Sequence, residues 1–360
     1  LSRRRMMQTV GAAAVLPPSA FAAPPDSWPP AEGPNTPKIC LGAFGGADEA
    51  GMRRLKQIGV DYVLMGGPKI PWEEADLHSR MERFKAGGIT VCNMMIGGFP
   101  NAIMGRPGRD EEIEKVIQSI RAAGKAGLPV VEYNWYVHRA MEGYYEEVGR
   151  SGAGYTAFDY DKMRDLPPLP QTGVRALEET WSTITYFLKA VVPVAVESKV
   201  RLALHPNDPP VPVSRGSGQI MASLAGWKRL VDIVKSPANG ITFDSGVTRE
   251  MGEDPVAVAR YFGSRDCINH VHFRNVVVRV PNEKYTEVFL DTGQVNMFAV
   301  MRELVRQKYP RAIYPEHPRA IDYDRERGNI RNQYPGGGGF GAEIYNVAYT
   351  KAMLQAALSS

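Results

Sequence analysis

Eight short apolar segments alternate with eight longer segments of helical pattern between about residues 38 and 358. This alternation predicts parallel strands connected by helices, and eight such units favour a closed (β/α)8 barrel of the α/β class, the TIM-barrel fold. The predicted strands cover residues 38–42, 61–65, 89–95, 129–133, 200–204, 240–244, 267–272 and 312–316. The predicted helices cover residues 48–58, 72–87, 110–126, 174–198, 226–235, 254–262, 296–308 and 341–358.

The rival architecture is a doubly wound protein of two domains. No composition break or linker divides residues 38–358, and most links between the units are short. A chain of 360 residues is long enough for one large barrel with a terminal extension. We therefore expect a single barrel domain over residues 38–358.

Charge and cysteine content exclude several classes of protein. The chain has 43 Lys and Arg against 39 Asp and Glu, and residues 1–22 hold three of those arginines and no acid. The remainder, with 40 basic and 39 acidic residues, lacks the excess expected of a nucleic-acid-binding protein. No apolar run reaches the ~20 residues of a membrane span. Three cysteines without a close pair argue against a disulfide framework and against a structural zinc site.

The first residues have the pattern of an export signal. Arg3–Arg5 precede a mildly apolar stretch, which ends in Ala20-Phe21-Ala22, an A-x-A cleavage pattern. Paired arginines in this position are typical of a twin-arginine signal, which we predict over residues 1–22, with a proline-rich spacer over residues 23–37. A basic disordered tail is the alternative. The signal predicts a periplasmic protein.

Four connections that follow predicted strands are long: 134–172, 205–225, 273–295 and 317–340. In a TIM barrel the loops after the strands build the active site, and long loops without regular structure commonly serve as lids or binding loops. The last of them contains four consecutive glycines, 336–339. We expect these glycines to form a mobile lid rather than a phosphate-binding loop, because they do not open a P-loop motif.

One polar residue stands at the end of each of the last four predicted strands: His205, Asp244, His272 and Glu316. Neighbouring strands lie about 5 Å apart, so these side chains can converge. Two imidazoles and two carboxylates suit Mn, Zn, Fe, Co or Ni. We therefore predict a divalent metal site with these four ligands. Taken alone, each residue also has a structural explanation, such as a helix N-cap for Asp244.

The seventh predicted strand carries two histidines, His270 and His272. Residues two apart on a strand share a face, so both side chains point to the same side. His272 is nearer the end of the strand and is the predicted ligand, while His270 is expected to pack deeper or to support the ligand. The sequence alone does not decide between the two.

Several segments resemble motifs of one family. Segment 202–210 reads Leu-Ala-Leu-His-Pro-Asn-Asp-Pro-Pro and segment 272–276 reads His-Phe-Arg-Asn-Val. Together with segments 187–195, 133–134 and 157–161, they resemble the mannonate dehydratase family, within the xylose-isomerase-like barrel superfamily. The resemblance extends over the predicted barrel and is densest in its second half.

This resemblance implies a xylose-isomerase-like TIM barrel and a metal held by four side chains. The four ligand positions map onto His205, Asp244, His272 and Glu316. Manganese is the first expectation, and Zn, Co, Ni and Fe are the alternatives. The implied reaction is β-elimination of water from a sugar acid, which gives a 2-keto-3-deoxy acid.

The chain also departs from the family pattern. The family has cysteine where this chain has Asp244, and Asp-His where this chain has Glu316-His317. Its histidine-rich stretch after the seventh strand corresponds to residues 285–290, which contain no histidine, and its Asp-Trp-Thr-Arg-Thr segment corresponds to residues 138–142. The segments that contact substrate therefore differ from the family pattern.

Candidates for proton transfer lie on the same loops. His317 follows Glu316, and because histidine can titrate near neutral pH it is our first candidate for acid/base catalysis. Tyr136, His138 and Tyr334 lie on the long loops and are weaker candidates. Packing or surface roles are the alternative for all three.

Candidates for substrate binding lie at the strand ends. Arg274, which is also a predicted catalytic residue, can form a fork with a substrate carboxylate, or it can pair with a structural acid. Tyr133 and Asn134, at the end of the fourth predicted strand, are placed to contact sugar hydroxyls, and Asn207 and Tyr334 complete the predicted set.

Three functions compete. The first is a metal-dependent carbon–oxygen lyase, a dehydratase acting on a sugar acid or keto-sugar. The second is a metal-dependent sugar isomerase or epimerase, and the third is a non-catalytic periplasmic protein that binds carbohydrate. The expected partner is a small sugar or sugar acid, with neither nucleic acid nor membrane span. The sequence names neither the sugar nor the native metal, and homo-oligomerisation is an expectation from the superfamily alone.

Overall fold

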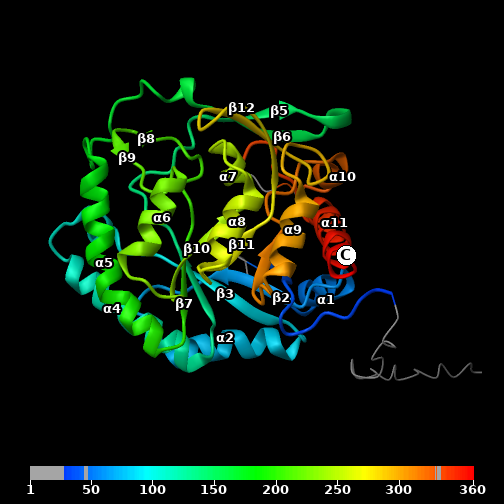
Figure 1. Ribbon diagram of the computed structural model, residues 1–360, viewed down its shortest axis with the longest axis horizontal. Coiled ribbons are helices and arrows are strands. Elements are labelled where there is room, and N and C mark those ends of the chain that lie inside the picture. The colour runs from blue at the N-terminus through cyan, green and yellow to red at the C-terminus, as the bar shows by residue number, and fades with distance from the viewer. Residues whose placement is uncertain (1–27, 44–47, 329, 331–333) are drawn as a thin grey trace, which may run out of the picture.

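The computed structural model describes residues 28–43, 48–328, 330 and 334–360 (Figure 1). The predicted signal 1–22 and residues 23–27 of the spacer lie outside this part of the chain. Eight parallel strands close into a barrel in the order β1-β14-β11-β10-β7-β4-β3-β2, which confirms the predicted fold. Their bounds are β1 Lys38–Gly42, β2 Tyr62–Gly66, β3 Thr90–Ile96, β4 Val130–Tyr133, β7 Arg201–Leu204, β10 Asn239–Asp244, β11 Ile268–His272 and β14 Ala312–Tyr314.

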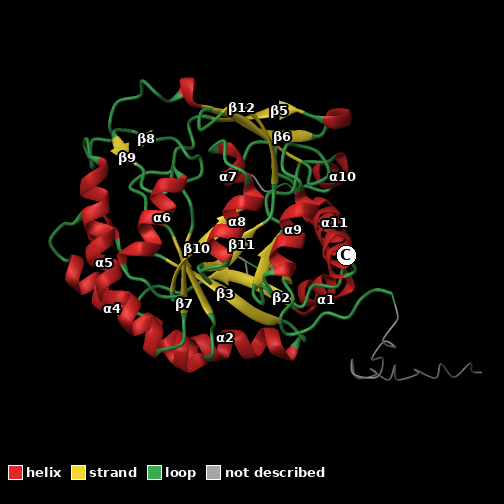
Figure 2. Ribbon diagram, viewed as in Figure 1, coloured by secondary structure: helices red, strands yellow, loops and turns green. Residues whose placement is uncertain are grey.

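Helices surround the barrel (Figure 2). Each of the eight predicted helices is present within a few residues of its expected bounds, and none of the described helices is long and apolar enough to cross a bilayer. These eight are α1 Glu49–Gln57, α2 Glu74–Ala86, α4 Arg109–Ala126, α5 Leu177–Glu197, α6 Leu224–Ile233, α8 Pro255–Gly263, α9 Met297–Arg306 and α11 Phe340–Leu358. Three short helices add to them: α3 Pro100–Met104, α7 Ser245–Glu250 and α10 Asp322–Glu326.

Alternation along the strands separates the apolar core from a polar interior. In β10, Phe243 is fully buried in the apolar core, while its neighbour Thr242 bonds to a carboxylate of another barrel strand. In β11, Val271 likewise joins the apolar core between His270 and His272. Burying one large apolar side chain contributes about 1.5–3 kcal/mol, so the outer layer stabilises a barrel whose interior carries polar groups.

Two of the long connections form a second sheet, which corrects the expectation of structureless loops. Strands β5 (Tyr144–Val148) and β6 (Gly154–Asp159) come from the connection after β4, and β12 (Asn275–Val280) and β13 (Lys284–Val288) from the connection after β11. They form one antiparallel sheet in the order β12-β13-β6-β5, shown at the top of Figure 1. The pairing of β13 with β6 joins segments more than a hundred residues apart, which local pattern does not reveal. The connection after β7 adds only the hairpin of β8 (Val213–Ser214) and β9 (Ser217–Gly218).

The glycine run is packed rather than projecting as a lid, which corrects a further expectation. Residues 336–339 are buried. The buried carboxylate of Asp324 accepts hydrogen bonds from the backbone of Gly339, Gly341 and Ala342, and so caps α11. In addition, the N–H of Gly338 donates to the carbonyl of Pro318. Glycine is required here because a Cβ at Gly338 would lie 2.3 Å from the carbonyl oxygen of Arg319.

Candidate active site

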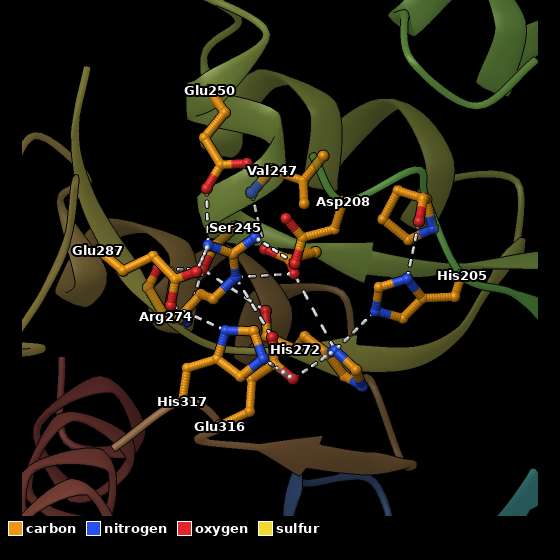
Figure 3. Close-up of polar contacts among 12 residues, drawn as sticks. His205, Asp208, Ser245, Val247, Glu250, His272, Arg274, Glu287, Glu316 and His317 are labelled. Atoms are coloured by element: carbon orange, nitrogen blue, oxygen red, sulfur yellow. Dashed lines mark hydrogen bonds and ion pairs between the residues drawn. The ribbon is translucent and has the colours of Figure 1, made fainter. Parts of the chain in front are cut away.

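The four predicted ligands meet at the carboxyl ends of β7, β10, β11 and β14. Figure 3 labels three of them, His205, His272 and Glu316. His272 lies at their centre. Its Nδ1 is 3.1 Å from Nε2 of His205, 3.0 Å from Oε2 of Glu316 and 4.0 Å from Oδ2 of Asp244. The closed barrel produces this convergence because it pairs Asp244 directly with His272, and His272 with the residue two before Glu316. Neighbouring strand ends thus bring together four residues from distant parts of the sequence.

His205 is oriented with one ring nitrogen toward this cluster. Its Nδ1 lies 2.7 Å from the carbonyl oxygen of Pro206 and must donate, since a carbonyl can only accept. The lone pair is then on Nε2, which faces His272. Burial, with a further contribution from the charge of His272, lowers the pKa of His205 to about 3. His205 is therefore a neutral imidazole, the form that binds metals.

Asp244 caps a helix, one of the roles considered from the sequence, and its other carboxylate oxygen faces the remaining predicted ligands. Its Oδ1 accepts the N–H of Val247 at 2.8 Å and caps α7. Its Oδ2 faces the cluster and lies 3.0 Å from Nε of Arg274. Burial raises the pKa of Asp244 to about 6, although Arg274 opposes the rise. The short helix α7 thus fixes the carboxylate in place and leaves one oxygen for the site.

Charges in the cluster are strongly coupled to one another. Burial lowers the pKa of His272, but Glu316 and Glu132 raise it more, to about 9. Burial raises the pKa of Glu316, but His272 and His317 bring it well below its usual value. Protonated His272 is then the cation that pairs with the carboxylates of Glu316 and Glu132.

Arg274 is enclosed by protein carboxylates, which corrects its expected role as a binder of substrate carboxylate. Arg274 is 1% exposed, although it lies only two residues beyond the end of β11. Its Nη1 lies 2.6 Å from Glu250, and its Nε lies 3.2 Å from Glu316 as well as 3.0 Å from Asp244. The alternative considered for Arg274, a structural ion pair, describes this geometry. Glu250 was not among the predicted site residues. It lies on the short helix α7 after the sixth barrel strand, and no sequence motif indicated a role for it.

His317 lies beside the cluster with both ring nitrogens near carboxylates. Its Nδ1 is 2.8 Å from Glu287 and its Nε2 is 3.5 Å from Glu316. Burial lowers the pKa of His317, but these two carboxylates raise it above the usual value. The residue has φ +48°, in the left-handed region, and its side chain keeps 15% of its surface exposed. A strained, partly exposed histidine at the mouth of the barrel fits a role in proton transfer.

The second sheet supplies residues that the sequence did not indicate. Glu287, on β13, bonds to His317 and also lies 3.0 Å from Arg319. Burial raises the pKa of Glu287, but His317 and Arg319 lower it to about 2. On the same face, Tyr285 bonds to the hydroxyl of Tyr144, which donates to Asp208 at 2.7 Å. The alternation of Tyr285 and Glu287 along a strand was the available signal, but the segment was expected to be a loop.

Two predicted substrate contacts are not brought to the cluster. Tyr133 packs its ring against Phe187 of α5, 5.8 Å between centroids, on the outer side of the barrel wall. This position corrects the prediction, because its neighbour Glu132 takes the inward place on β4. Asn207 is buried, and its Oδ1 accepts the backbone N–H of Met221, a structural contact. Asn134 lies at the end of β4, and its amide contacts Sδ of Met95.

The three weaker candidates for proton transfer are placed differently from one another. Tyr334 packs against the ring of His317 at 4.7 Å, so it lies at the site. Tyr136 is close enough to Asp208 for that carboxylate to add to the effect of burial in raising its pKa. His138 instead pairs with Glu142 at 3.1 Å, and Glu142 also pairs with Arg215. His138 is therefore held in a loop ion-pair network.

The donor set fits a divalent metal. His205, Asp244 and His272 offer ligand atoms that all lie within 4.8 Å of one another, and Glu316 contacts His272. Within the described residues, Oε1 of Glu316 is buried and makes no hydrogen bond, although it forms an ion pair with Nε of Arg274 at 3.2 Å. In the described part of the chain, six buried carboxylates but only two buried guanidinium groups lie in or beside the cluster, so acidic groups outnumber basic ones when the histidines are neutral. A cation among imidazole and carboxylate ligands would offset that charge. The carboxylates are Glu132, Asp208, Asp244, Glu250, Glu287 and Glu316, and the guanidinium groups belong to Arg274 and Arg319.

A TIM barrel with histidines and carboxylates converging at its strand ends defines an enzyme of the xylose-isomerase-like class. The model of the family D-mannonate dehydratase (UxuA) matches residues 173–359. Mannonate dehydratase from Streptococcus equi subsp. zooepidemicus is 30% identical over 323 residues, which cover 81% of this chain and 88% of that protein. The chain belongs to the D-mannonate dehydratase (UxuA) family. It is therefore a carbon–oxygen lyase of the dehydratase type, as the motifs indicated.

Solved structures agree with this assignment. The crystal structure of mannonate dehydratase from Streptococcus suis serotype 2 has a TM-score of 0.80 and 25% identity, and the match covers 90% of this chain and 94% of that chain. A xylose isomerase domain protein from Alicyclobacillus acidocaldarius has a TM-score of 0.59 at 14% identity, over 90% of this chain and 99% of that chain. The second likeness shows the shared fold alone and confirms the xylose-isomerase-like barrel.

Proposed function

We propose that the protein removes water from a sugar acid and that it uses a divalent metal, manganese first, held by His205, Asp244, His272 and Glu316. The observation that carries the proposal is the convergence of two imidazoles and two carboxylates around Nδ1 of His272. Membership of the dehydratase family supports the reaction type. The anionic surroundings support a bound cation.

The reaction is a β-elimination. A base removes the proton on the carbon next to the carboxylate, and the electron pair of that C–H bond forms a C=C bond as the adjacent C–O bond breaks. An acid protonates the departing hydroxyl, which leaves as water, and the resulting enol becomes a 2-keto-3-deoxy acid. A bound metal supplies Lewis-acid polarisation of substrate oxygens.

His317 is the residue that we assign to proton transfer. Glu287 receives Nδ1–H and orients the ring, so that Nε2 faces the cluster beside Glu316. Tyr334 packs on the same ring and restricts its motion. The imidazole can therefore hold or release a proton at Nε2 without a change of position.

Metal content and product mass together test the proposal. Untagged protein is expected to hold near-stoichiometric metal and to convert one member of an aldonate and uronate panel into a product lighter by one water. His205→Ala combined with Asp244→Ala removes two of the four ligands, so bound metal is expected to fall below roughly a tenth of an equivalent, and the activity with it.

The control for this variant is His78→Ala combined with Asp322→Ala, since both side chains are exposed and outside the barrel. It is expected to keep metal and activity.

A product of unchanged mass would identify a sugar isomerase or epimerase instead. Tight sugar binding without turnover and without metal would identify a binding protein.

We also propose that the protein is exported to the periplasm. The support is the sequence of residues 1–22, with Arg3–Arg5 and the Ala20-Phe21-Ala22 pattern. Expressed with its full N-terminus in a bacterium, the chain is expected in the periplasmic fraction, shortened by cleavage after Ala22. Arg4→Lys combined with Arg5→Lys is expected to retain it, uncleaved, in the cytoplasm. An uncleaved wild type in the cytoplasmic fraction would contradict export.

A further inference from the structure

Glu132 is a buried carboxylate in the barrel interior, and each of its two oxygens accepts one hydrogen bond. It lies on β4 and is 0% exposed. Its Oε1 accepts from the hydroxyl of Thr242 at 2.7 Å, and its Oε2 accepts from the amide of Asn93 at 2.8 Å. These donors come from β10 and β3, so the carboxylate is held from two sides of the barrel. Such a fixed position is the kind that orients a neighbouring group.

Glu132 faces Nε2 of His272, the ring nitrogen that points away from the other predicted ligands. Nε2 of His272 lies 3.5 Å from Oε1 of Glu132, while Nδ1 of the same ring faces His205 and Glu316. Among the described residues, His272 is the one cationic group that pairs with Glu132, and its buried Nε2 makes no hydrogen bond there, so Glu132 is the acceptor within its reach. His270 packs edge-on against the His272 ring, with 5.2 Å between the ring centroids. The two nitrogens of His272 thus face two different environments.

We propose that Glu132 is a positioning residue for the metal site: it accepts the Nε2–H of His272 and so leaves the lone pair of that ring on Nδ1, toward the metal. This inference rests on the proposed metal site. A carboxylate behind a metal-bound histidine fixes its tautomer and raises its basicity, and its removal typically costs 10–100-fold in metal affinity. Glu132 acts through His272 and contacts neither metal nor substrate.

Glu132→Gln removes the charge with little change of shape. The remaining carbonyl oxygen can still accept from His272 and Thr242, and the new amide needs one acceptor. Oδ1 of Asn93 is buried and, within the described part of the chain, has no hydrogen-bond partner, so a turned Asn93 amide can supply that acceptor. The variant therefore tests the negative charge rather than the packing.

Thr242→Val is the matched control, because it removes a hydrogen bond to the same carboxylate but leaves the charge and the contact with His272. Each metal-free protein is titrated with Co²⁺ by visible absorption and with Mn²⁺, and its thermal unfolding is recorded. Glu132→Gln is expected to bind both ions roughly 10–100-fold more weakly than the wild type, and Thr242→Val within about threefold. Both variants should unfold at similar temperatures.

A second measurement needs no variant. In wild-type protein with ring-¹⁵N histidine and Zn²⁺, the shifts of His272 are expected to show a metal-bound Nδ1 and a protonated Nε2. The reverse assignment, or a Glu132→Gln variant that binds as tightly as the wild type, would overturn the role of Glu132 alone. A wild type that binds none of the three metals would overturn the proposed function, and the inference with it.

Discussion

Replacing His317 by asparagine is expected to lower kcat by roughly 10²–10⁴-fold while the bound metal remains. Asparagine tolerates the left-handed backbone at this position, φ +48°, better than most residues. Its amide can also donate to Glu287, as Nδ1 does over 2.8 Å. What it cannot do is exchange a proton near neutral pH. The loss should therefore appear in kcat more than in KM, measured with the substrate identified by the panel.

His78→Asn is the control for this substitution, since His78 is an exposed residue of α2. It should leave kcat within a factor of about two, as expected for a surface change away from the site. Elemental analysis of both variants shows whether the metal is retained. If His317→Asn kept near-wild-type kcat, proton transfer would have to be assigned to another residue, with Tyr334 as the next candidate because it packs on the same ring.

Arg274→Met is expected to lower the free energy of unfolding by about 3–5 kcal/mol, the range for breaking a buried ion pair. The guanidinium lies within 3.7 Å of five carboxylates, and its removal leaves them without the buried cation that they share. Methionine fills the volume of the aliphatic stem, so the loss reflects charge more than packing. Urea unfolding in EDTA measures it. Added Mn²⁺ should restore part of the stability, because a ligand that binds only the folded state stabilises it.

The matched control is Arg229→Met, which breaks an exposed pair with Glu178 and should cost less than about 1 kcal/mol. Arg274→Lys should fall between the two, since it keeps the charge but not the planar fork that reaches several carboxylates at once. Equal stability of Arg274→Met and Arg229→Met would mean that the carboxylates protonate at little cost. The anionic centre would then give no support for a resident cation.

Much of the fold follows from local pattern. The barrel strands were predictable because the strands of a parallel barrel are buried on both faces. Each of them therefore appears in the sequence as a short, nearly continuous apolar run. The second sheet was not predictable in this way. Its strands lie in two loops, β5 and β12 are partly exposed, and β13 is stabilised by pairing with β6. Nothing local distinguishes such a segment from a loop.

The candidate site divides along the same line. His205, Asp244, His272 and Glu316 could be found because each stands where a strand ends, and the ends of parallel strands meet. Tyr133 was misassigned because the strand boundary alone does not tell which of two adjacent residues faces inward. Glu132, beside it, takes the inward place. Which residues of a strand face inward depends on how that strand pairs with its neighbours. The register shift between β10 and β11 at Ile241 and Thr242 is an example.

The repeating strand–helix architecture and the four residues at its strand ends were predictable from the amino-acid sequence alone. Periodicity and residue type are local properties of the chain. Because the ends of neighbouring strands lie side by side in a closed parallel barrel, these properties are enough to predict which residues converge. The charged groups around these four residues, among them Glu250, Glu287 and Arg319, could be identified only in the folded molecule. Their place depends on contacts between segments far apart in the chain, and the buried ion pairs they form exist only once the barrel and the second sheet have come together.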